Sequence, residues 1–587
     1  MVGSQSRPVS RAERRRRNMN RFHAWRAARA RPATGFVTTP EPRAIGSIAR
    51  GRQLLAGNYL FAGYLVEAPH TSVWDLRMPS ESFEVALNSF GWLDDLAAVG
   101  DGRARFAAQD WTWEWIERFG GGEGPGWTPD LTGRRLIRWI NHAILLLRGR
   151  SPEESSAFFR SLGQQTIFLS RRWKATTPGL ERFEALVGLI YAGLALTGME
   201  RRVGPALRAL ARECEAQIDE AGGIPSRNPE HLLEVFTLLS WAAQALRNAD
   251  REPGPEHQAA MERIAPTLRA LRHSDGGLAR FHGGGQAQDG RLDAALAAVR
   301  VRATVQTGQL AMGYSRVTAS RTSVIVDAAA PPTGAAGINA HASTLAFELT
   351  SGRRQLIVNC GSGATFGDTW RRAGRATPTH STLGIEGISS SRLGSSSEGG
   401  EVLLDRPTEV TMKCRRIADG TQLLLSHNGY VPSHGLSHVR NLLLSDDGRS
   451  LSGEDTLGAL NDGDRARFEL VMNEVQLKGV AFSVRFHLHP DVEAEAELGG
   501  TAVSLVLKSG EVWVFRHDGA AELSLEPSVY LERTRLKPRA SQQIVLNGRV
   551  MDFGRQVGWT LAKAQDTPQV MRDVVEAEAA ITAATLD

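Results

Sequence analysis

The sequence predicts a multidomain chain of α + β class, in which a helical half precedes an antiparallel β-sandwich. Two observations predict this order. Apolar residues recur at helical spacing from about Ile45 to Arg300, and they alternate with period two after about Val301. The 587 residues exceed one average domain, so the chain has room for more than one hydrophobic core.

The helical half is predicted over residues 46–300. The segment LTGRRLIRWINHAILLLRG (131–149) places Leu136, Ile140, Ala143 and Leu147 on one stripe, and residues 181–198 follow the same pattern. Breakers such as SPEE, TTPG and EAGG separate these segments. Repeated helix–turn–helix units with short connections indicate a bundle or an α/α toroid.

The β-sandwich is predicted over residues 301–565. The segments RTSVIVDA (321–328), RQLIVN (354–359) and VAFSVRFHL (480–488) are rich in β-branched or alternating apolar residues. Many short strands at this spacing indicate two packed antiparallel sheets. The tail, residues 566–587, is expected to be helical and peripheral.

Positive charge is concentrated at the N-terminus. Residues 1–45 hold eleven Arg and two acidic residues, a net charge of +9, whereas the whole chain carries +5, so the rest of the chain carries −4. We therefore expect a disordered Arg-rich arm, which could bind phosphates or a membrane surface. Association with nucleic acid is unlikely except through this arm.

The cysteines and the N-terminal residues bear on location. Three cysteines are too few for a disulfide framework or a zinc cluster, which fits a reducing or cysteine-neutral setting. No apolar run reaches the ~18 residues that span a bilayer, and no hydrophobic segment follows the cluster Arg14 to Arg17. We expect neither a signal peptide nor a membrane anchor.

The densest polar cluster opens the predicted sandwich. His341 precedes one strand, Asn359 ends the next, and His380 opens a third. Neighbouring strands lie ~5 Å apart, so these side chains could converge on one ligand or ion. Two histidines and an amide oxygen are a weak set of metal ligands, because Asn contributes no charge. Histidines hydrogen-bonded at a domain interface are the alternative.

A series of motifs runs through residues 310–490. In order they are Asn339-Ala-His341-Ala-Ser343, Asn359-Cys-Gly361, Arg371 to His380-Ser-Thr382, SHNGY (426–430), HVRNLLL (438–444) and RFHLHP (485–490). This series resembles the heparinase II/III-like polysaccharide lyases, which carry His-x-His-x-Asp, Asp-x-Gly and an Arg-rich segment leading to His-Asn/Ser-Thr. The chain is thus similar to a divergent member of that family.

The resemblance implies a fold, an activity and a location. The fold is an incomplete (α/α) toroid followed by an antiparallel β-sandwich. The activity is cleavage of an acidic, uronic-acid-containing polysaccharide by β-elimination. A divalent metal, zinc or calcium, would be held by His341, Asn359 and His380. Relatives generally work in the periplasm or cell envelope, but without a visible signal peptide the cytoplasm stays open.

Several family positions are altered. In the helical half the resemblance is weaker and rests on residues 179–196 and 220–236. The Asn that neutralises the substrate carboxylate in the family falls near Leu180, and its catalytic Tyr falls on His231. The family's proton-carrying His falls on Asn339, whose amide exchanges no proton near neutral pH.

Two interpretations follow from these changes. His231 could replace the tyrosine as base or acid, since a histidine titrates near neutrality, and complete a catalytic set with Asn339 and His341. The residues that could bind the substrate are Arg227, Asn228, Arg371, Arg375, His427 and Tyr430. Alternatively, the lost groups are not replaced, and the chain is a catalytically impaired glycan-binding or cell-envelope protein on the same scaffold.

Overall fold

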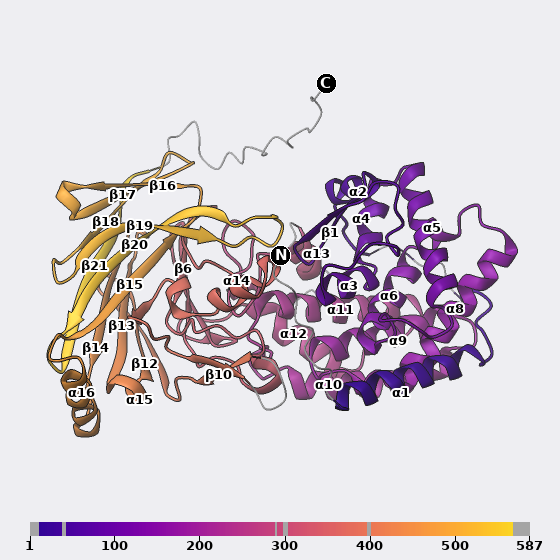
Figure 1. Ribbon diagram of the computed structural model, residues 1–587, viewed down its shortest axis with the longest axis horizontal. Coiled ribbons are helices and arrows are strands. Elements are labelled where there is room, and N and C mark those ends of the chain that lie inside the picture. The colour runs from indigo at the N-terminus through magenta and orange to yellow at the C-terminus, as the bar shows by residue number, and fades with distance from the viewer. Residues whose placement is uncertain are drawn as a thin grey trace. The chain divides into compact units, whose positions relative to one another are not determined.

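A computed structural model describes residues 11–37, 41, 43–287, 290–297, 303–395 and 401–566. The chain divides into two compact units. The helical unit holds residues 1–225, 231–265 and 293–301, and the sandwich unit holds residues 226–230, 266–292 and 302–587. The segments 226–230 and 266–292 therefore belong with the sandwich although they lie in the first half of the sequence. Figure 1 labels the helices and strands and colours the chain from indigo at the N-terminus to yellow at the C-terminus.

Helices dominate the first half of the chain. They are α1 (Arg11–Ala28), α2 (Ile48–Leu55), α3 (Glu81–Asn88), α4 (Gly91–Val99), α5 (Gly102–Phe119), α6 (Pro129–Asn141), α7 (Ala143–Leu147), α8 (Pro152–Arg172), α9 (Leu180–Ala195), α10 (Val203–Gln217), α11 (Pro229–Asn248), α12 (Pro255–Ala270) and α13 (Arg291–Ala297). A small hairpin, β1 (Asn58–Phe61) with β2 (Tyr64–Glu67), interrupts them.

Glycines allow helices α6 and α9 of this unit to pack with their backbones close together. A Cβ added at Gly133 would lie 2.3 Å from the carbonyl oxygen of Glu184, and one added at Gly188 would lie 2.5 Å from the Cα of Gly133. Such distances are below any real contact, so only glycine lets the two backbones approach this closely. Helix α8 begins with a capping box, in which the Ser151 and Glu154 side chains satisfy each other's backbone N–H groups.

The N-terminal arm was predicted to be disordered, but the part of it that the structure describes contains a helix. Residues Arg11–Ala28 form α1, which packs against α8 within the helical unit. Asn20, Ala24 and Ala27 are buried at helical spacing, and Arg172 of α8 donates to the Asn20 amide oxygen at 2.8 Å. The arginines lie on the exposed part of this helix. Their number makes the segment look like a disordered basic arm in the sequence, although a few small residues between them are buried. Residues 567–587 of the predicted tail lie outside the described residues.

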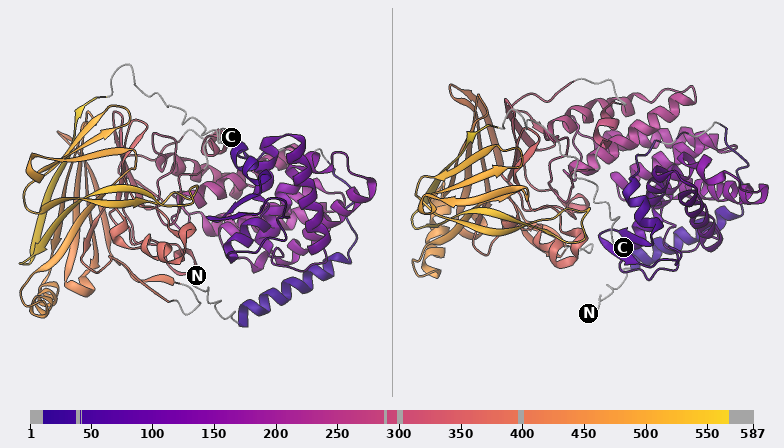
Figure 2. Two further views of the ribbon diagram at one scale, coloured as in Figure 1. Left: turned by 45° about the horizontal axis from the view of Figure 1, so that its top comes forward. Right: turned by 90° about the horizontal axis from the view of Figure 1, so that it is seen from above.

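The second half forms a sandwich of antiparallel sheets. One sheet has the strand order β19-β20-β15-β7-β6-β5-β4-β3, with β8 paired to β15, and the other has the order β11-β12-β13-β14-β21-β18-β17-β16. Figure 2 shows the long strands of this unit in layers. The first sheet is made of β3 (Leu310–Ala311), β4 (Tyr314–Ala319), β5 (Thr322–Asp327), β6 (Phe347–Ser351), β7 (Arg354–Val358), β8 (Leu383–Ile385), β15 (Val480–Leu488), β19 (Glu522–Tyr530) and β20 (Arg539–Val550).

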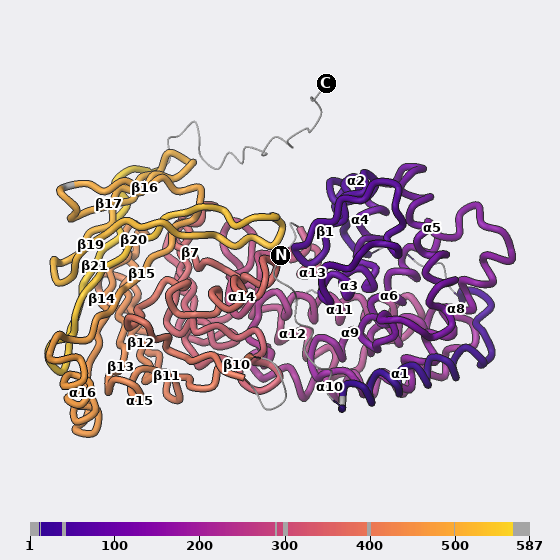
Figure 3. Tube along the Cα trace, viewed as in Figure 1, coloured from indigo at the N-terminus to yellow at the C-terminus, as the bar shows by residue number. Residues whose placement is uncertain are grey.

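The second sheet is made of β11 (Val410–Ile417), β12 (Gly420–Tyr430), β13 (Leu436–Ser445), β14 (Ser450–Gly458), β16 (Val492–Glu497), β17 (Ala502–Leu507), β18 (Val512–His517) and β21 (Gly554–Gln565). A separate hairpin joins β9 (Arg392–Ser395) to β10 (Glu401–Asp405). Short helices α14 (Asp368–Ala373), α15 (Val431–His434) and α16 (Asp462–Glu474) lie in the connections, and Figure 3 follows the chain from β12 through α15 into β13.

The core of the sandwich unit lies between its sheets. Side chains along β13 and β14 alternate between buried and partly exposed, which is the period of two that the sequence predicts. Phe347, Phe486 and Trp559 pack together in this core. The predicted order of a helical half and an antiparallel sandwich is confirmed. Among the described residues, no helix has the length and apolar character needed to cross a bilayer.

Candidate functional site

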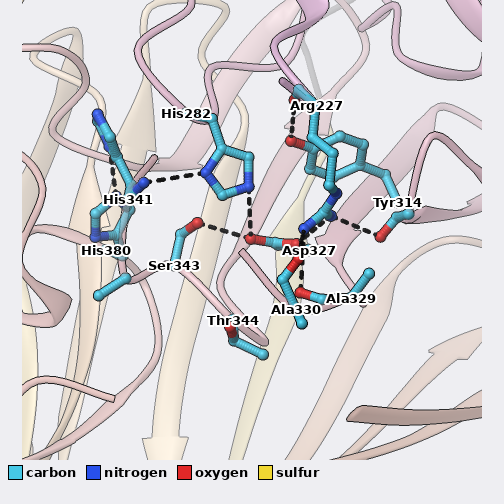
Figure 4. A network of polar contacts seen from close by, with 12 residues as sticks. Arg227, His282, Tyr314, Asp327, Ala329, Ala330, His341, Ser343, Thr344 and His380 are labelled. Carbon is cyan, nitrogen blue, oxygen red and sulfur yellow. Dashed lines mark hydrogen bonds and ion pairs between the residues drawn. The ribbon is translucent and has the colours of Figure 1, made fainter. Parts of the chain in front are cut away.

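Arg227 organises a buried polar cluster at the start of the sandwich unit (Figure 4). Its guanidinium donates to Asp327 Oδ1 at 2.5 Å and lies 4.7 Å from the ring centroid of Tyr314. Its other N–H groups donate to the backbone carbonyls of Met312, Gly313, Ala329 and Ala330. Because these bonds use all five N–H groups of the guanidinium, Arg227 has no donor left for a substrate carboxylate.

Asp327 ends β5 and is fully buried. Its Oδ2 accepts a hydrogen bond from Ser343 Oγ at 2.7 Å and lies 3.6 Å from Nε2 of His282. Burial raises the pKa of this carboxyl, and the charge of Arg227 offsets only part of that rise. Asp327 therefore joins an arginine, a serine and a histidine from three separate segments.

Three histidines continue the cluster, and their hydrogen bonds fix which nitrogen carries the proton. His282 Nδ1 accepts from the backbone N–H of His341 at 3.1 Å, so its proton lies on Nε2, toward Asp327. His380 Nδ1 donates to the Ala376 carbonyl at 2.9 Å, so its Nε2 accepts from His341 Nδ1 at 3.1 Å. His341 is thereby left with a lone pair on Nε2.

Burial keeps these three rings neutral at neutral pH. Burial lowers the pKa of His380 to about 4, and it lowers the pKa values of His282 and His341 well below their ordinary value. Nearby positive charge on Arg375 acts in the same direction for His282 and His341. A neutral imidazole with a lone pair can accept a proton or a hydrogen bond, so Nε2 of His341 is available for either role.

Asn359 does not complete a metal site with His341 and His380. Its Oδ1 accepts from the backbone N–H of Ser381 at 3.0 Å, and its Nδ2 donates to Glu348 Oε1 at 3.3 Å. The amide oxygen already accepts one hydrogen bond, and no carboxylate of the set supplies charge. In the described part of the chain, no group of three His, Cys, Asp or Glu side chains is placed to hold a metal. These residues do not fit zinc or calcium.

Two of the predicted substrate-binding arginines differ in accessibility. Arg375 is buried and donates to the backbone carbonyls of Gly337, Ala340 and Glu401. Arg371, on α14, is partly exposed and lies beside the exposed Asn339, with 3.5 Å from its Nη2 to the amide oxygen of Asn339. Arg371 and Asn339 are therefore the predicted residues that face solvent together.

His427 and Tyr430 lie inside the sandwich rather than at its surface. Tyr430 donates to the Leu383 carbonyl at 3.0 Å, and His427 Nε2 lies 3.3 Å from His438 Nδ1. His438 in turn bonds the buried Asp455 at 2.8 Å. Both predicted residues belong to a buried network that joins strands, and neither has an atom turned to a ligand.

Comparisons with known proteins identify the family. Residues 308–560 match the family described as heparinase II/III-like, C-terminal. FtsZ-localized protein C of Caulobacter vibrioides (strain NA1000 / CB15N) is 31% identical over 552 residues, which cover 92% of each chain. The chain belongs to the heparinase II/III-like family.

Solved structures of this heparinase-like family share the fold. Heparinase III has a TM-score of 0.68 at 13% identity, covering 92% of this chain and 88% of that one. Heparan sulfate lyase HepC from Pedobacter heparinus has a TM-score of 0.56 at 14% identity, covering 94% and 89%. The predicted class, a helical toroid followed by a sandwich, is confirmed.

The family positions in the helical half lie apart from the cluster in sequence. Leu180 is the first residue of α9, and its side chain cannot neutralise a carboxylate. His231 stands in the first turn of α11, is partly exposed, and belongs to the helical unit. Asn228 belongs to the sandwich unit, where its Nδ2 donates to the His282 carbonyl at 3.1 Å.

Sequence reasoning missed His282 and Asp327. His282 stands in the Gly-rich segment FHGGGQ, which reads as a loop, and Asp327 ends an ordinary predicted strand. A signal was present, because a histidine between an aromatic residue and three glycines is unusual for a solvated turn. Its partners lie 45 and 59 residues further along the chain, and no periodicity reveals such contacts.

Proposed function

We propose that this heparinase-like chain works at the bacterial division site, where it binds an acidic, uronic-acid-containing polysaccharide without cleaving it. The location is supported by the relative named FtsZ-localized protein C, which matches 92% of this chain. Binding without cleavage is supported by one observation, namely that all five N–H groups of Arg227 are hydrogen-bonded within the protein, so that this buried arginine has none left for a uronate carboxylate.

The chemistry of β-elimination explains why that observation matters. The reaction must neutralise the uronate carboxylate, remove the C5 proton and protonate the leaving oxygen. By the resemblance, the Asn that neutralises the carboxylate in the family falls near Leu180 and its proton-carrying His falls on Asn339, and neither side chain can take over these roles. Arg227 offers no replacement, because its guanidinium is satisfied by Asp327 and backbone carbonyls.

Binding an acidic sugar requires a positive charge with free hydrogen-bond donors but no proton carrier. Arg371 provides that charge. The guanidinium is partly exposed, donates to the Ile338 carbonyl at 3.2 Å, and keeps further N–H groups for a carboxylate. Asn339 beside it can both donate to and accept from a sugar hydroxyl. The pair therefore fits an acidic sugar without offering a proton carrier.

Binding is tested with the full chain and three uronic-acid polymers, polygalacturonate, alginate and hyaluronate, by calorimetry. Arg371→Ala is expected to weaken binding about tenfold, since a charge-assisted hydrogen bond contributes roughly 1.5 kcal/mol. Arg372→Ala is the matched control, because that exposed neighbour pairs with Glu401. Equal binding by both variants and the parent would remove Arg371 from the site.

Location is tested separately with a fluorescent fusion in Caulobacter vibrioides cells that lack the FtsZ-localized relative. We expect a midcell band that coincides with labelled FtsZ and disappears when FtsZ is depleted. A diffuse signal in dividing cells would contradict the division-site half of the proposal and leave the glycan half to calorimetry.

Cleavage by β-elimination is the second candidate, favoured by the lone pair on His341 Nε2. In this reaction His341 takes the C5 proton, the C–H electrons form the C4–C5 double bond, and the C4–O bond breaks. The leaving oxygen takes a proton from water. Ultraviolet absorbance of the new double bond, abolished by His341→Ala, would establish this candidate. No absorbance with a polymer that binds would exclude it.

A further inference from the structure

A pocket of about 370 Å³ is lined by residues of the helical unit alone. It is formed by the end of α4, the start of α5 and the junction between α6 and α7. Ala97, Ala98 and Leu145 give it an apolar wall. This volume and lining are typical of small-molecule sites, in which a few polar groups fix the ligand's orientation.

An aspartate–histidine pair forms the base of the pocket. Asp94 accepts from His142 Nε2 at 2.8 Å and from Arg138 Nε at 3.0 Å. Burial alone raises the pKa of Asp94, but the charge of Arg138 and the hydrogen bond from His142 outweigh it and leave that pKa lowered. The Asp94 carboxylate accepts the Nε2–H of His142, which leaves Nδ1 as the other polar atom of that ring.

Asn141, next to His142 in the sequence, adds a hydrogen-bond donor to the lining of the pocket. The side chain is 2% exposed, and its Nδ2 is buried without a hydrogen-bond partner. A buried N–H group left unpaired costs roughly 1–3 kcal/mol, which a ligand acceptor would recover. Asn141 and His142 both line the pocket.

Two arginines complete the lining. Arg148 is exposed and Arg105 is partly exposed, and both line the same pocket. Neither has a carboxylate partner among the ion pairs of the described residues. The pocket thus combines two cations, one unpaired amide donor, one imidazole ring and an apolar wall.

We propose that this pocket binds a monomeric acidic sugar unit of the hexuronic acid type. A sugar hydroxyl can accept from Asn141 Nδ2 while a neighbouring hydroxyl forms a hydrogen bond with His142 Nδ1. The carboxylate pairs with Arg105 and Arg148, and the CH face of the ring packs on the alanines. The site is independent of the sandwich cluster, so either can fail without the other.

The test uses the full chain and glucuronate as the probe, with saturation-transfer NMR and calorimetry. We expect saturable binding of glucuronate and at least tenfold weaker binding of glucose. Arg148→Ala is expected to weaken glucuronate binding about tenfold, the loss of one charge-assisted pair. Arg103→Ala, an exposed neighbour on α5 outside the pocket lining, is the control and should leave binding unchanged.

A second variant guards against a purely structural effect. Asn141→Leu removes the unpaired N–H, so we expect it to weaken glucuronate binding at least tenfold while the unfolding midpoint is kept or raised. Arg371→Ala reports the sandwich site and should leave binding at the pocket intact. Absence of saturable binding overturns the proposal. Equal binding of benzoate, which has a carboxylate but no hydroxyls, overturns the sugar assignment.

Discussion

At the scale of single residues, burial sets the protonation of the candidate site. It is the largest cause of the lowered pKa values of His282, His341 and His380. A histidine whose folded pKa is depressed binds fewer protons folded than unfolded as the pH falls. Its folded state therefore loses stability from the ordinary pKa of 6.5 down to the folded pKa.

His380 gives that argument a measurable form. Its folded pKa is about 4, so between pH 6.5 and pH 5 it should lower the free energy of unfolding by about 2 kcal/mol. We expect His380→Gln to show a correspondingly smaller loss between pH 7 and pH 5 in urea titrations. His70→Gln, at an exposed histidine of the helical unit, is the control. Identical pH dependence in all three proteins would contradict a neutral, buried His380.

At the scale of elements, the contact between α6 and α9 depends on glycine. Gly133→Ala would place a methyl group 2.3 Å from the Glu184 carbonyl oxygen, so the two backbones must separate. We expect this variant to lose about 1–3 kcal/mol of stability in urea unfolding, the cost of overpacking a core. Gly102→Ala, whose added Cβ meets nothing within 4 Å, should change stability by much less. Equal effects would mean that α6 and α9 do not limit the packing.

The same elements show how far sequence periodicity reaches. The strand predicted over 480–488 is β15. A β-strand is the regular structure whose side chains alternate between two faces, so an alternating apolar pattern predicts it directly. The helix predicted over 131–149 divides at His142 into α6 and α7. Of its predicted stripe, Leu136, Ile140 and Ala143 are buried, whereas Leu147, after the break, is partly exposed. An apolar stripe predicts which side chains are buried, but it does not predict where a helix is interrupted by a single residue.

The candidate site was predictable only where its residues follow strands. His341 and His380 were expected to converge, and their ring nitrogens lie 3.1 Å apart. Their link through His282 to Asp327 depends on a loop that returns from the first half of the sequence. The hydrogen bonds that occupy Asn359 and Arg227 are equally distant in sequence, so composition and spacing could not tell a satisfied side chain from a ligand-binding one.

At the scale of the whole molecule, each unit has its own source of stability. In the sandwich unit, the buried Asp455 accepts from Arg440, His438 and Trp559 of its own sheet. Arg440 also donates to the carbonyls of Leu345 and Ser381, which precede β6 and β8 of the facing sheet. This buried ion pair therefore ties the two sheets together, and removing one partner leaves the other charge unpaired.

Asp455→Asn should consequently destabilise the sandwich by about 3–5 kcal/mol and leave the helical unit's own core intact. Measured by hydrogen exchange with mass spectrometry, peptides from β6, β13 and β14 are expected to exchange faster together, because the network spans both sheets. Peptides from α6 and α9 should keep their protection, whereas Gly133→Ala should produce the reverse pattern. Faster exchange in α6 and α9 upon Asp455→Asn would show instead that the two units unfold as a single cooperative body.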